Sequence, residues 1–217
     1  MIGTDKINSF IRVVSFKSCL FTIGILGTLA LFVLARAYAT FPGDERAILE
    51  LQALRTPWLD DVVVWFANLR MVWVFLLAVA VLSGGLLLSR RYDDVALVVA
   101  TLPVVGIGFG LKLLVDRPRP EYQMFGPIQT DPSFPSGHAL LAVIIGGILV
   151  YLVERSVKPM ALRRTIQVAL FMAVIWIGIS RVYMGVHWPS DVIGSYLFGV
   201  MALMGLVRLR NLLASTR

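Results

Sequence analysis

The chain has 217 residues, of which 58% are hydrophobic and only 15% are charged, and its mean hydropathy is +0.83. These values are typical of a protein with many membrane-spanning segments and argue against an ordinary soluble domain. The formal net charge of +7 does not indicate nucleic-acid binding, because the basic residues separate apolar runs and form no stripe with interleaved aromatic residues. We therefore expect the lipid bilayer, and no nucleic acid, as the main partner, and no obligatory protein partner is evident.

The sequence favours neither disulfide nor metal chemistry. Its single cysteine, Cys19, cannot form an intramolecular disulfide. There is no cysteine pair and no His-Glu-x-x-His motif, so we expect no zinc site and no cofactor. The first apolar run begins near Ser18 and is long enough to remain as an anchor, so we expect no cleaved signal peptide.

Six apolar runs are candidates for transmembrane helices, since a charge-free stretch of about 20 residues crosses the hydrocarbon core. In chain order they are 21–35 with its flanks, 71–89, 95–111, 139–153, 165–180 and 192–207. The last four are short, but each is extended at one end by a polar residue: Lys112, His138, Arg181 and Asp191. The sequence thus predicts one all-α, polytopic membrane domain over residues 1–217, with six transmembrane helices. In the third run, Gly106 and Gly110 predict close helix packing within the monomer.

The longest connection, residues 40–70, joins the first two runs. Apolar residues recur at helical spacing after Pro57, and a weaker apolar stripe follows Asp44, which we expect to be a helix N-cap. Trp58 and Trp65 suit the lipid headgroup level. We expect one or two interfacial helices here, which either pack as a cap over the site or also gate lipid entry.

Alternation of six spans places the four polar extensions on one side of the membrane. With the amino terminus inside the cell, the cytoplasmic segments hold 12 basic residues and the outer segments hold 8, of which three are motif residues. The excess of basic residues on the inner side predicts cytoplasmic termini and a site that faces outward from a cell (inner) membrane.

Both histidines of the chain lie in three polar stretches at these span ends. The stretches are Lys112 followed after six residues by Arg119-Pro120; Pro135-Ser136-Gly137-His138; and Ser180-Arg181 followed by His187 and Asp191. The second stretch is typical of a helix start, where free backbone N–H groups point at an anion, and Trp188-Pro189-Ser190-Asp191 predicts a second start of the same kind.

These residue types suit the binding and attack of a phosphate. Lys112, Arg119 and Arg181 are three fixed cations for the three non-bridging oxygens. Asp191 can accept a hydrogen bond from one ring nitrogen of His187 and so aim the other nitrogen as a nucleophile. His138 remains to protonate the departing oxygen and then to activate water.

The stretches KLLVDRPRP, PSGH and SRVYMGVHWPSD resemble the tripartite signature of the type 2 phosphatidic acid phosphatase family, and no signature position departs from the pattern. That family includes membrane lipid phosphatases, undecaprenyl pyrophosphate phosphatases and glucose-6-phosphatase, with vanadium haloperoxidases as soluble relatives. The resemblance covers residues 112–191. It implies phosphate contacts from Lys112, Arg119, Ser136, Gly137 and Arg181, with His138 as general acid, His187 as the nucleophile that forms a phosphohistidine, and Asp191 as its partner.

Other charged residues near the motifs have simpler interpretations. We interpret Arg117 as a membrane anchor or a loop salt bridge. Asp116, Glu121 and Asp131 are expected to be solvated loop charges.

The leading hypothesis is a metal-independent phosphatase for a lipid phosphate or pyrophosphate on the outer leaflet. Resemblance to compact bacterial members favours undecaprenyl pyrophosphate, while phosphatidylglycerol phosphate, phosphatidic acid and a lipid A phosphate present the same group. The alternatives are a phosphotransferase that moves the phosphate to another lipid and, outside enzymes, a lipid-phosphate transporter or sensor. A haloperoxidase is disfavoured because those relatives are soluble.

Overall fold

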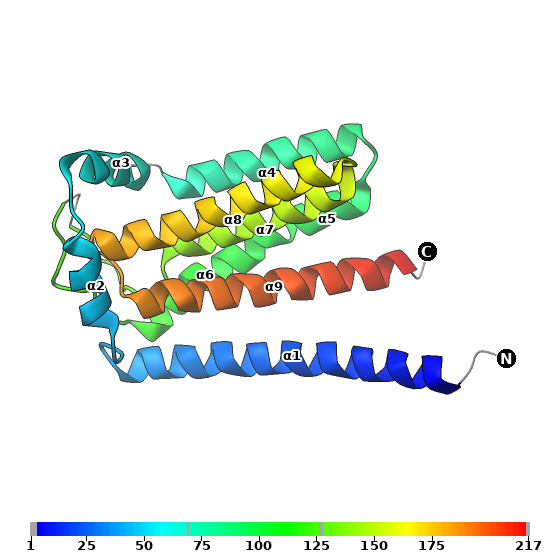
Figure 1. Ribbon diagram of the computed structural model, residues 1–217, viewed down its shortest axis with the longest axis horizontal. Helices are drawn as coiled ribbons and strands as arrows, with labels where there is room; N and C mark the ends of the chain where they lie inside the picture. Colours follow the sequence, from blue (N-terminus) through cyan, green and yellow to red (C-terminus); the bar gives the residue numbers. More distant parts are fainter. Residues whose placement is uncertain (1–3, 69, 126–127, 216–217) are drawn as a thin grey trace.

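A computed structural model describes residues 4–68, 70–125 and 128–215, and in these residues the chain forms nine helices and no strand (Figure 1). The helices are α1 (Thr4–Ala37), α2 (Asp44–Gln52), α3 (Pro57–Ala67), α4 (Met71–Leu88), α5 (Tyr92–Val99), α6 (Thr101–Val115), α7 (Gly137–Ser156), α8 (Met160–Tyr183) and α9 (Pro189–Ser215).

Within the described residues, six segments are long and apolar enough to cross a membrane, which confirms the predicted six-span, all-α architecture. They are Ser18–Ala37, Met71–Leu88, Tyr92–Val115, Gly137–Ser156, Met160–Tyr183 and Pro189–Ser215. The four short apolar runs are completed by the polar motif residues, as the sequence predicts, because Lys112, His138, Arg181 and Asp191 all lie inside these helices.

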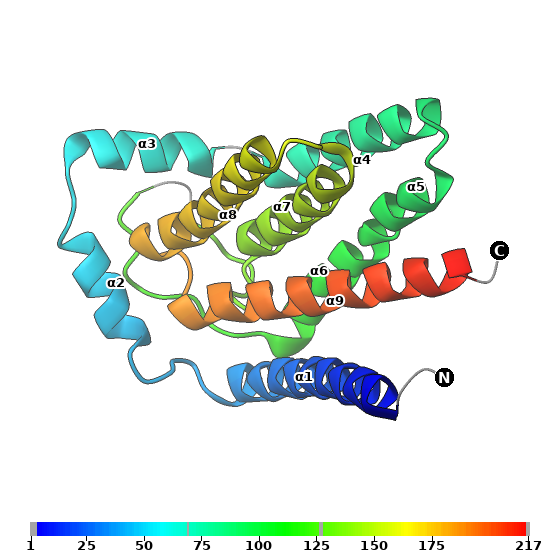
Figure 2. The same ribbon diagram turned by 45° about the vertical axis from the view of Figure 1, so that its right-hand side comes forward.

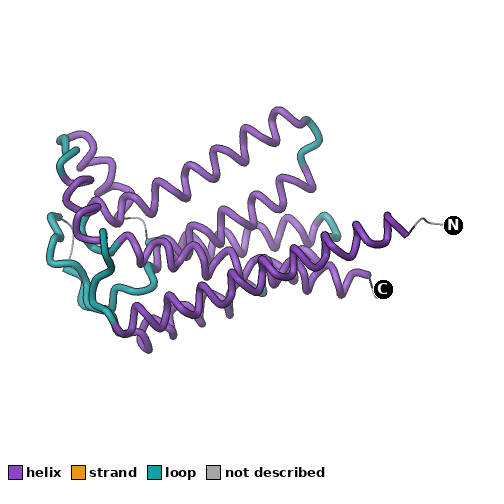
Figure 3. Tube along the Cα trace, turned by 60° about the horizontal axis from the view of Figure 1, so that its bottom comes forward, coloured by secondary structure: helices purple, strands orange, loops and turns teal. Residues whose placement is uncertain are grey.

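The spans run up and down, so that both termini lie at one end of the bundle (Figures 1 and 2). At the other end lie α2, α3 and the connections from α6 to α7 and from α8 to α9. The loops of these connections gather together there, as Figure 3 shows. We call this the motif end, because all three sequence motifs reach it, and the opposite one the terminal end.

The third span is not one continuous helix. It consists of α5 and α6, which meet at Ala100. Pro103 lies in the first turn of α6, where a residue without a backbone N–H is tolerated. In an unbroken helix continuing from α5, Pro103 could not donate the backbone hydrogen bond to Val99. The interruption lies closer to the Tyr92 end of the span than to the Val115 end. The Thr101 hydroxyl donates to the Val98 carbonyl there, at 2.6 Å.

Helices α2 and α3 lie between the first two spans, where the sequence predicts one or two helices. Pro57 occupies the first turn of α3, where its fixed φ is favourable. The prediction that Asp44 is an N-cap is wrong: Gly43, at φ 91°, is the N-cap, and Asp44 is the first helical residue. The side chain of Asp44 is buried and pairs with distant residues.

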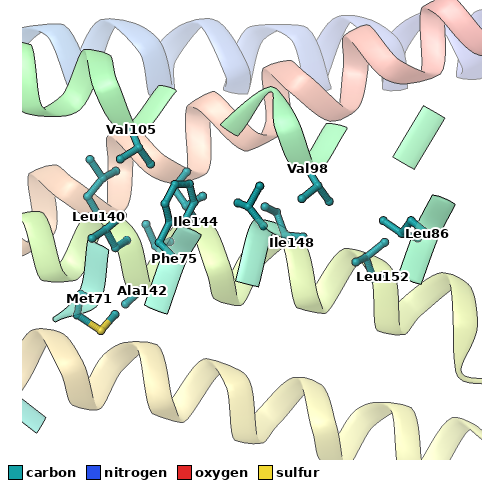
Figure 4. Close-up of a cluster of buried hydrophobic side chains, with 13 residues drawn as sticks. Met71, Phe75, Leu86, Val98, Val105, Leu140, Ala142, Ile144, Ile148 and Leu152 are labelled. Atoms are coloured by element: carbon teal, nitrogen blue, oxygen red, sulfur yellow. The ribbon is translucent and has the colours of Figure 1, made fainter. Parts of the chain in front are cut away.

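The main apolar core is formed by buried side chains of α4, α5, α6 and α7 (Figure 4). Phe75, Val98, Leu140, Ile144 and Ile148 are almost inaccessible. Half of the most apolar window of α7 is buried, against a third or less for each of the other five spans. Helix α7 is therefore the central element, and close packing fixes the position of the Pro-Ser-Gly-His motif at its start.

A buried carboxylate ties three helices together at the terminal end. Asp94 of α5 pairs with Arg91 at 2.7 Å and with Arg210 of α9 at 3.2 Å, and it accepts a hydrogen bond from Tyr151 of α7 at 3.1 Å. These contacts hold α5 against α7 and α9 at the end opposite the motifs.

The close packing predicted for Gly106 and Gly110 is wrong. A methyl group built on either glycine would meet no atom within 4 Å, so both face open space. The tightly packed glycine of α6 is Gly108, which lies against Leu140 and Phe198. Helices α8 and α9 also approach each other closely at a glycine, Gly178.

We predict that Gly178→Ala destabilises the protein by about 1–3 kcal/mol, because the added methyl group would collide with the Tyr196 ring and lie 2.6 Å from Val192 Cγ1. Gly110→Ala is the matched control: it faces open space in a helix, and a helical alanine is favoured over glycine by up to about 1 kcal/mol. Thermal unfolding of both variants in detergent measures the difference. Equal midpoints would show that the two helices do not meet closely at Gly178.

Candidate functional site

The three motifs converge on one cavity of about 380 Å³ at the motif end. Of the residues that the sequence singles out, those lining it are Lys112, Arg119, Gly137, His138, Arg181 and His187. They come from the last turn of α6, the loop after it, the first turn of α7, the last turn of α8 and the loop before α9. They meet because these helices alternate in direction, as the sequence predicts.

Lys112 and Arg119 converge on the carboxylate of Asp131. The Lys112 ammonium pairs with one carboxylate oxygen, and Arg119 Nη2 lies 2.9 Å from the other. Burial raises the pKa of Asp131, but hydrogen bonds and charge attraction from Lys112 and Arg119 outweigh that effect and hold the pKa below its usual value. The expectation of a solvated loop charge is therefore wrong: Asp131 is half exposed but bridges two motif cations.

Arg119 and Asp191 hold the His187 ring from opposite sides. Asp191 Oδ2 lies 3.3 Å from Nδ1, and Arg119 Nη1 lies 3.4 Å from Nε2. A carboxylate can only accept and a guanidinium can only donate, so both neighbours favour the tautomer with the proton on Nδ1. In this tautomer the Nε2 atom, on the Arg119 side of the ring, carries the lone pair.

His187 is buried, with only 4% of its surface exposed. Burial lowers its pKa to about 4, although the hydrogen bond and charge of Asp191 raise it. The imidazole is therefore neutral across the physiological pH range, and a neutral imidazole retains a nucleophilic lone pair.

Arg181 is a buried cation in the cavity wall, with 4% of its surface exposed. Among the described residues its guanidinium donates only to the Ser180 hydroxyl, from Nε and Nη2 at 3.2 Å each. A buried guanidinium has five donors, so most of the hydrogen-bonding capacity of Arg181 is available for an anion in the cavity.

The first turn of α7 contributes its glycine and histidine to the cavity, but not its serine. The Ser136 side chain is fully buried, and its carbonyl accepts a hydrogen bond from Ser195 of α9 at 3.0 Å. Gly137 lies close to the Phe109 ring, which a methyl group on Gly137 would approach to 3.1 Å. His138 is half-buried and lines the cavity.

The start of α9 differs from the predicted second anion site. The Ser190 N–H donates to Asp44 Oδ1 at 3.0 Å, so the anion at this helix start is a side chain of the protein. Of these two helix starts, that of α7 borders the cavity, through Gly137 and His138, and that of α9 does not.

The sequence allowed two interpretations of Arg117, a membrane anchor or a loop salt bridge. The structure shows a salt bridge, and it is buried: the Arg117 side chain is inaccessible and pairs with Asp44 and Asp191. The anchor interpretation is wrong. Sequence reasoning missed the contacts of Asp44 with Arg117 and Ser190, because the only local signal of Asp44 is that of a helix start.

One wall of the cavity is apolar, and the sequence motifs give no indication of it. It is formed by the end of α3, the start of α4, one residue each of α6 and α7, and the loop after α8. The apolar residues are Ala67, Met71, Val72, Trp73, Phe109, Leu141, Met184 and Val186. Trp73 is 64% and Val72 44% exposed, so this wall continues to the outer surface of the bundle. A larger cavity of about 930 Å³ lies between the end of α1 and α2, but no motif residue lines it.

Known proteins match both the sequence and the fold. A phosphatidylglycerophosphatase B of Bacillus subtilis is 27% identical over 165 residues, covering 73% of this chain and 78% of the relative. An undecaprenyl-diphosphatase of Sulfolobus acidocaldarius is 30% identical over 184 residues, covering 79% of this chain and 84% of the relative. The crystal structure of a transmembrane PAP2-type phosphatidylglycerolphosphate phosphatase from B. subtilis superposes with a TM-score of 0.71 at 22% identity, over 86% of this chain and 95% of that one.

The family match covers the part of the chain that holds the cavity. The sequence pattern of the PAP2 superfamily matches residues 94–214, which is more than half of the chain and includes all three motifs. The chain therefore belongs to the PAP2 superfamily.

Proposed function

We propose that this protein is an integral membrane phosphatase that hydrolyses a lipid phosphate or pyrophosphate through a phosphohistidine. The carrying observation is the arrangement around His187: a buried neutral imidazole, backed by Asp191, beside a cavity that Lys112, Arg119 and Arg181 line. The names of the relatives, which are phosphatases of membrane lipids, support the same reaction class.

The contact between Asp131, Lys112 and Arg119 supports the binding step. The Asp131 carboxylate is an anion that Lys112 and Arg119 bind at the same time. A phosphate is also an anion and has more oxygens, so the same two cations can bind it. Lys112, Arg119 and Arg181 would together bind the three non-bridging oxygens, joined by backbone N–H groups at Gly137. Charge that spreads over these oxygens in the transition state strengthens each contact.

The reaction then proceeds in two displacements. His187 Nε2 attacks phosphorus, the bond from phosphorus to the lipid-side oxygen breaks, and His138 gives a proton to that oxygen. In the second step His138 takes a proton from water, the water oxygen attacks phosphorus, and the bond to His187 breaks. Phosphate leaves, and both histidines return to their starting state. Asp191 holds the proton of Nδ1 in place throughout.

The site residues provide the positive charge that a metal ion contributes in other phosphatases. Lys112, Arg119 and Arg181 place three covalently attached cations around one cavity. We therefore propose a metal-independent reaction.

The apolar wall supports a lipid substrate. An acyl or isoprenoid chain can lie along Val72, Trp73 and Met71 toward the bilayer while its phosphate reaches the cations. We favour undecaprenyl pyrophosphate, as the S. acidocaldarius relative supports, with phosphatidylglycerol phosphate as the second candidate from the B. subtilis relative. Release of phosphate from a panel of purified lipid phosphates decides between them.

We also propose that the cavity opens to the outer face of the cell membrane. The 12 basic residues predicted on the inner side, against 8 on the motif side, support this orientation. The substrate would then be a lipid already moved to the outer leaflet.

We predict that His187→Gln lowers turnover more than about a thousandfold, because glutamine removes the ring nitrogen proposed to attack phosphorus. The test uses lipid with labelled phosphate, in excess EDTA. Wild-type protein should trap acid-labile, base-stable label and release free phosphate, and the variant should do neither.

The same experiment distinguishes the alternative functions. Label on a second lipid would identify a phosphotransferase, and binding without turnover would identify a transporter or sensor. A dependence on added Mg²⁺ would overturn the metal-independent step.

Asp131→Asn should strengthen inhibition by inorganic phosphate about threefold, because it removes a charge that competes for Lys112 and Arg119. The matched control is Asp116→Asn, which neutralises an exposed carboxylate of the same connection. Inhibition constants of the purified variants provide the measurement. Weaker phosphate inhibition in Asp131→Asn would mean that this carboxylate orients the cations for phosphate and does not compete with it.

A sidedness experiment tests the orientation. Once Cys19 is replaced by Ser, a cysteine introduced at Gln129, at the motif end, should react with a membrane-impermeant maleimide in intact cells. A cysteine introduced at Ser156, at the terminal end, should react only after the membrane is broken. The reverse labelling would place the cavity on the cytoplasmic leaflet.

A further inference from the structure

Arg117 lies two residues before Arg119 but does not reach the cavity. Its side chain is fully inaccessible, and Phe41 covers its guanidinium with a ring centroid 4.6 Å away. Nε donates to the Ala39 carbonyl at 3.0 Å, and Nη1 donates to Asp191 Oδ1 at 2.6 Å. A buried guanidinium is tolerated only where such partners satisfy it, so these contacts fix its position.

Asp44, at the start of α2, forms the second ion pair of Arg117. Its Oδ2 accepts from Arg117 Nη2 at 3.0 Å and from the Ser190 hydroxyl at 2.6 Å, and its Oδ1 accepts the Ser190 N–H at 3.0 Å. Asp44 therefore joins the connection between α1 and α2 to the first turn of α9, the helix that holds Asp191.

The hydrogen bonds of Asp191 show how its ion pair with Arg117 fixes the orientation of the carboxylate. Oδ1 accepts from Arg117, while Oδ2 accepts the Trp188 N–H at 2.9 Å and faces His187 Nδ1 at 3.3 Å. With one oxygen held by the guanidinium and the other by a backbone N–H, the carboxylate plane cannot rotate. The remaining capacity of Oδ2 is directed at the His187 ring.

We propose that Arg117 is a positioning residue, held by Asp44, that orients Asp191 and through it the tautomer and direction of the His187 ring. The chain of contacts runs from Asp44 through Arg117 and Asp191 to His187, and it makes α2 a fixed part of the site. The inference rests on the proposed function, in which His187 Nε2 attacks phosphorus.

Arg117→Lys and Asp44→Asn test the proposal in the full-length protein. Lysine retains the positive charge but not the fork that reaches both carboxylates. The control is Arg55→Lys, which alters a partly exposed pair with Asp60 at the same end of the bundle. Hydrolysis of a short-chain phosphatidic acid in detergent gives kcat and KM. Nitrogen NMR of isotope-labelled histidine reports the tautomer of His187, and His138 provides the internal reference because the chain has only these two histidines.

In Arg117→Lys we expect kcat to fall about tenfold to a hundredfold while KM stays within about twofold, because the ring is misaimed and the cavity cations are unchanged. The His187 signals should change from a single Nδ1–H tautomer to a mixture, while those of His138 stay constant. Asp44→Asn should shift both readouts in the same direction by less, and Arg55→Lys should shift neither.

Wild-type kcat and an unchanged His187 spectrum in folded Arg117→Lys would overturn the proposal, and so would a loss of kcat with an unchanged spectrum. If Arg117→Lys does not fold, Asp44→Asn carries the same test, because it retains the guanidinium. The spectrum does not depend on turnover. A wild-type protein that hydrolyses no phosphate ester would therefore refute the proposed function, while the tautomer still decides the positioning role.

Discussion

The guanidinium of Arg117 is removed from water and must be compensated by carboxylates, and that condition connects three parts of the chain that are far apart in sequence. Asp44 comes from the segment between the first two spans, and Asp191 from the start of the last span. All three side chains are buried, and none of them lines the cavity that the motif residues form. This charge cluster joins the start of α2, the loop after α6 and the first turn of α9.

Much of the fold could be predicted from the sequence, because it depends on patterns that are local. Hydropathy identifies the six spans, and the alternation of up and down helices is sufficient to bring the ends of α6, α7, α8 and α9 together. Lys112, His138 and His187 could therefore be assigned to one site from the sequence alone, and they do line one cavity.

The parts that could not be predicted depend on contacts between distant residues. Asp44 has the local pattern of a helix cap, but its partners Arg117 and Ser190 lie 73 and 146 residues away. Asp131 lies in a segment whose sequence is typical of a solvated loop, and its salt bridge with Lys112 forms only in the folded protein. The same holds for glycine packing: a Gly-x-x-x-Gly spacing does not show which face of α6 meets a neighbour, and Gly108 between the two lies against Leu140.

The order in which the chain is synthesised gives the Arg117 cluster a consequence for biogenesis. Asp44 and Arg117 enter the membrane with early segments, but Ser190 and Asp191 belong to α9, the last span. Before α9 inserts, Arg117 lacks one of its two carboxylates, and His187 lacks the carboxylate of Asp191. The contacts around Arg117 and His187 are therefore complete only once the last span is in place, because both residues depend on Asp191 for a carboxylate partner.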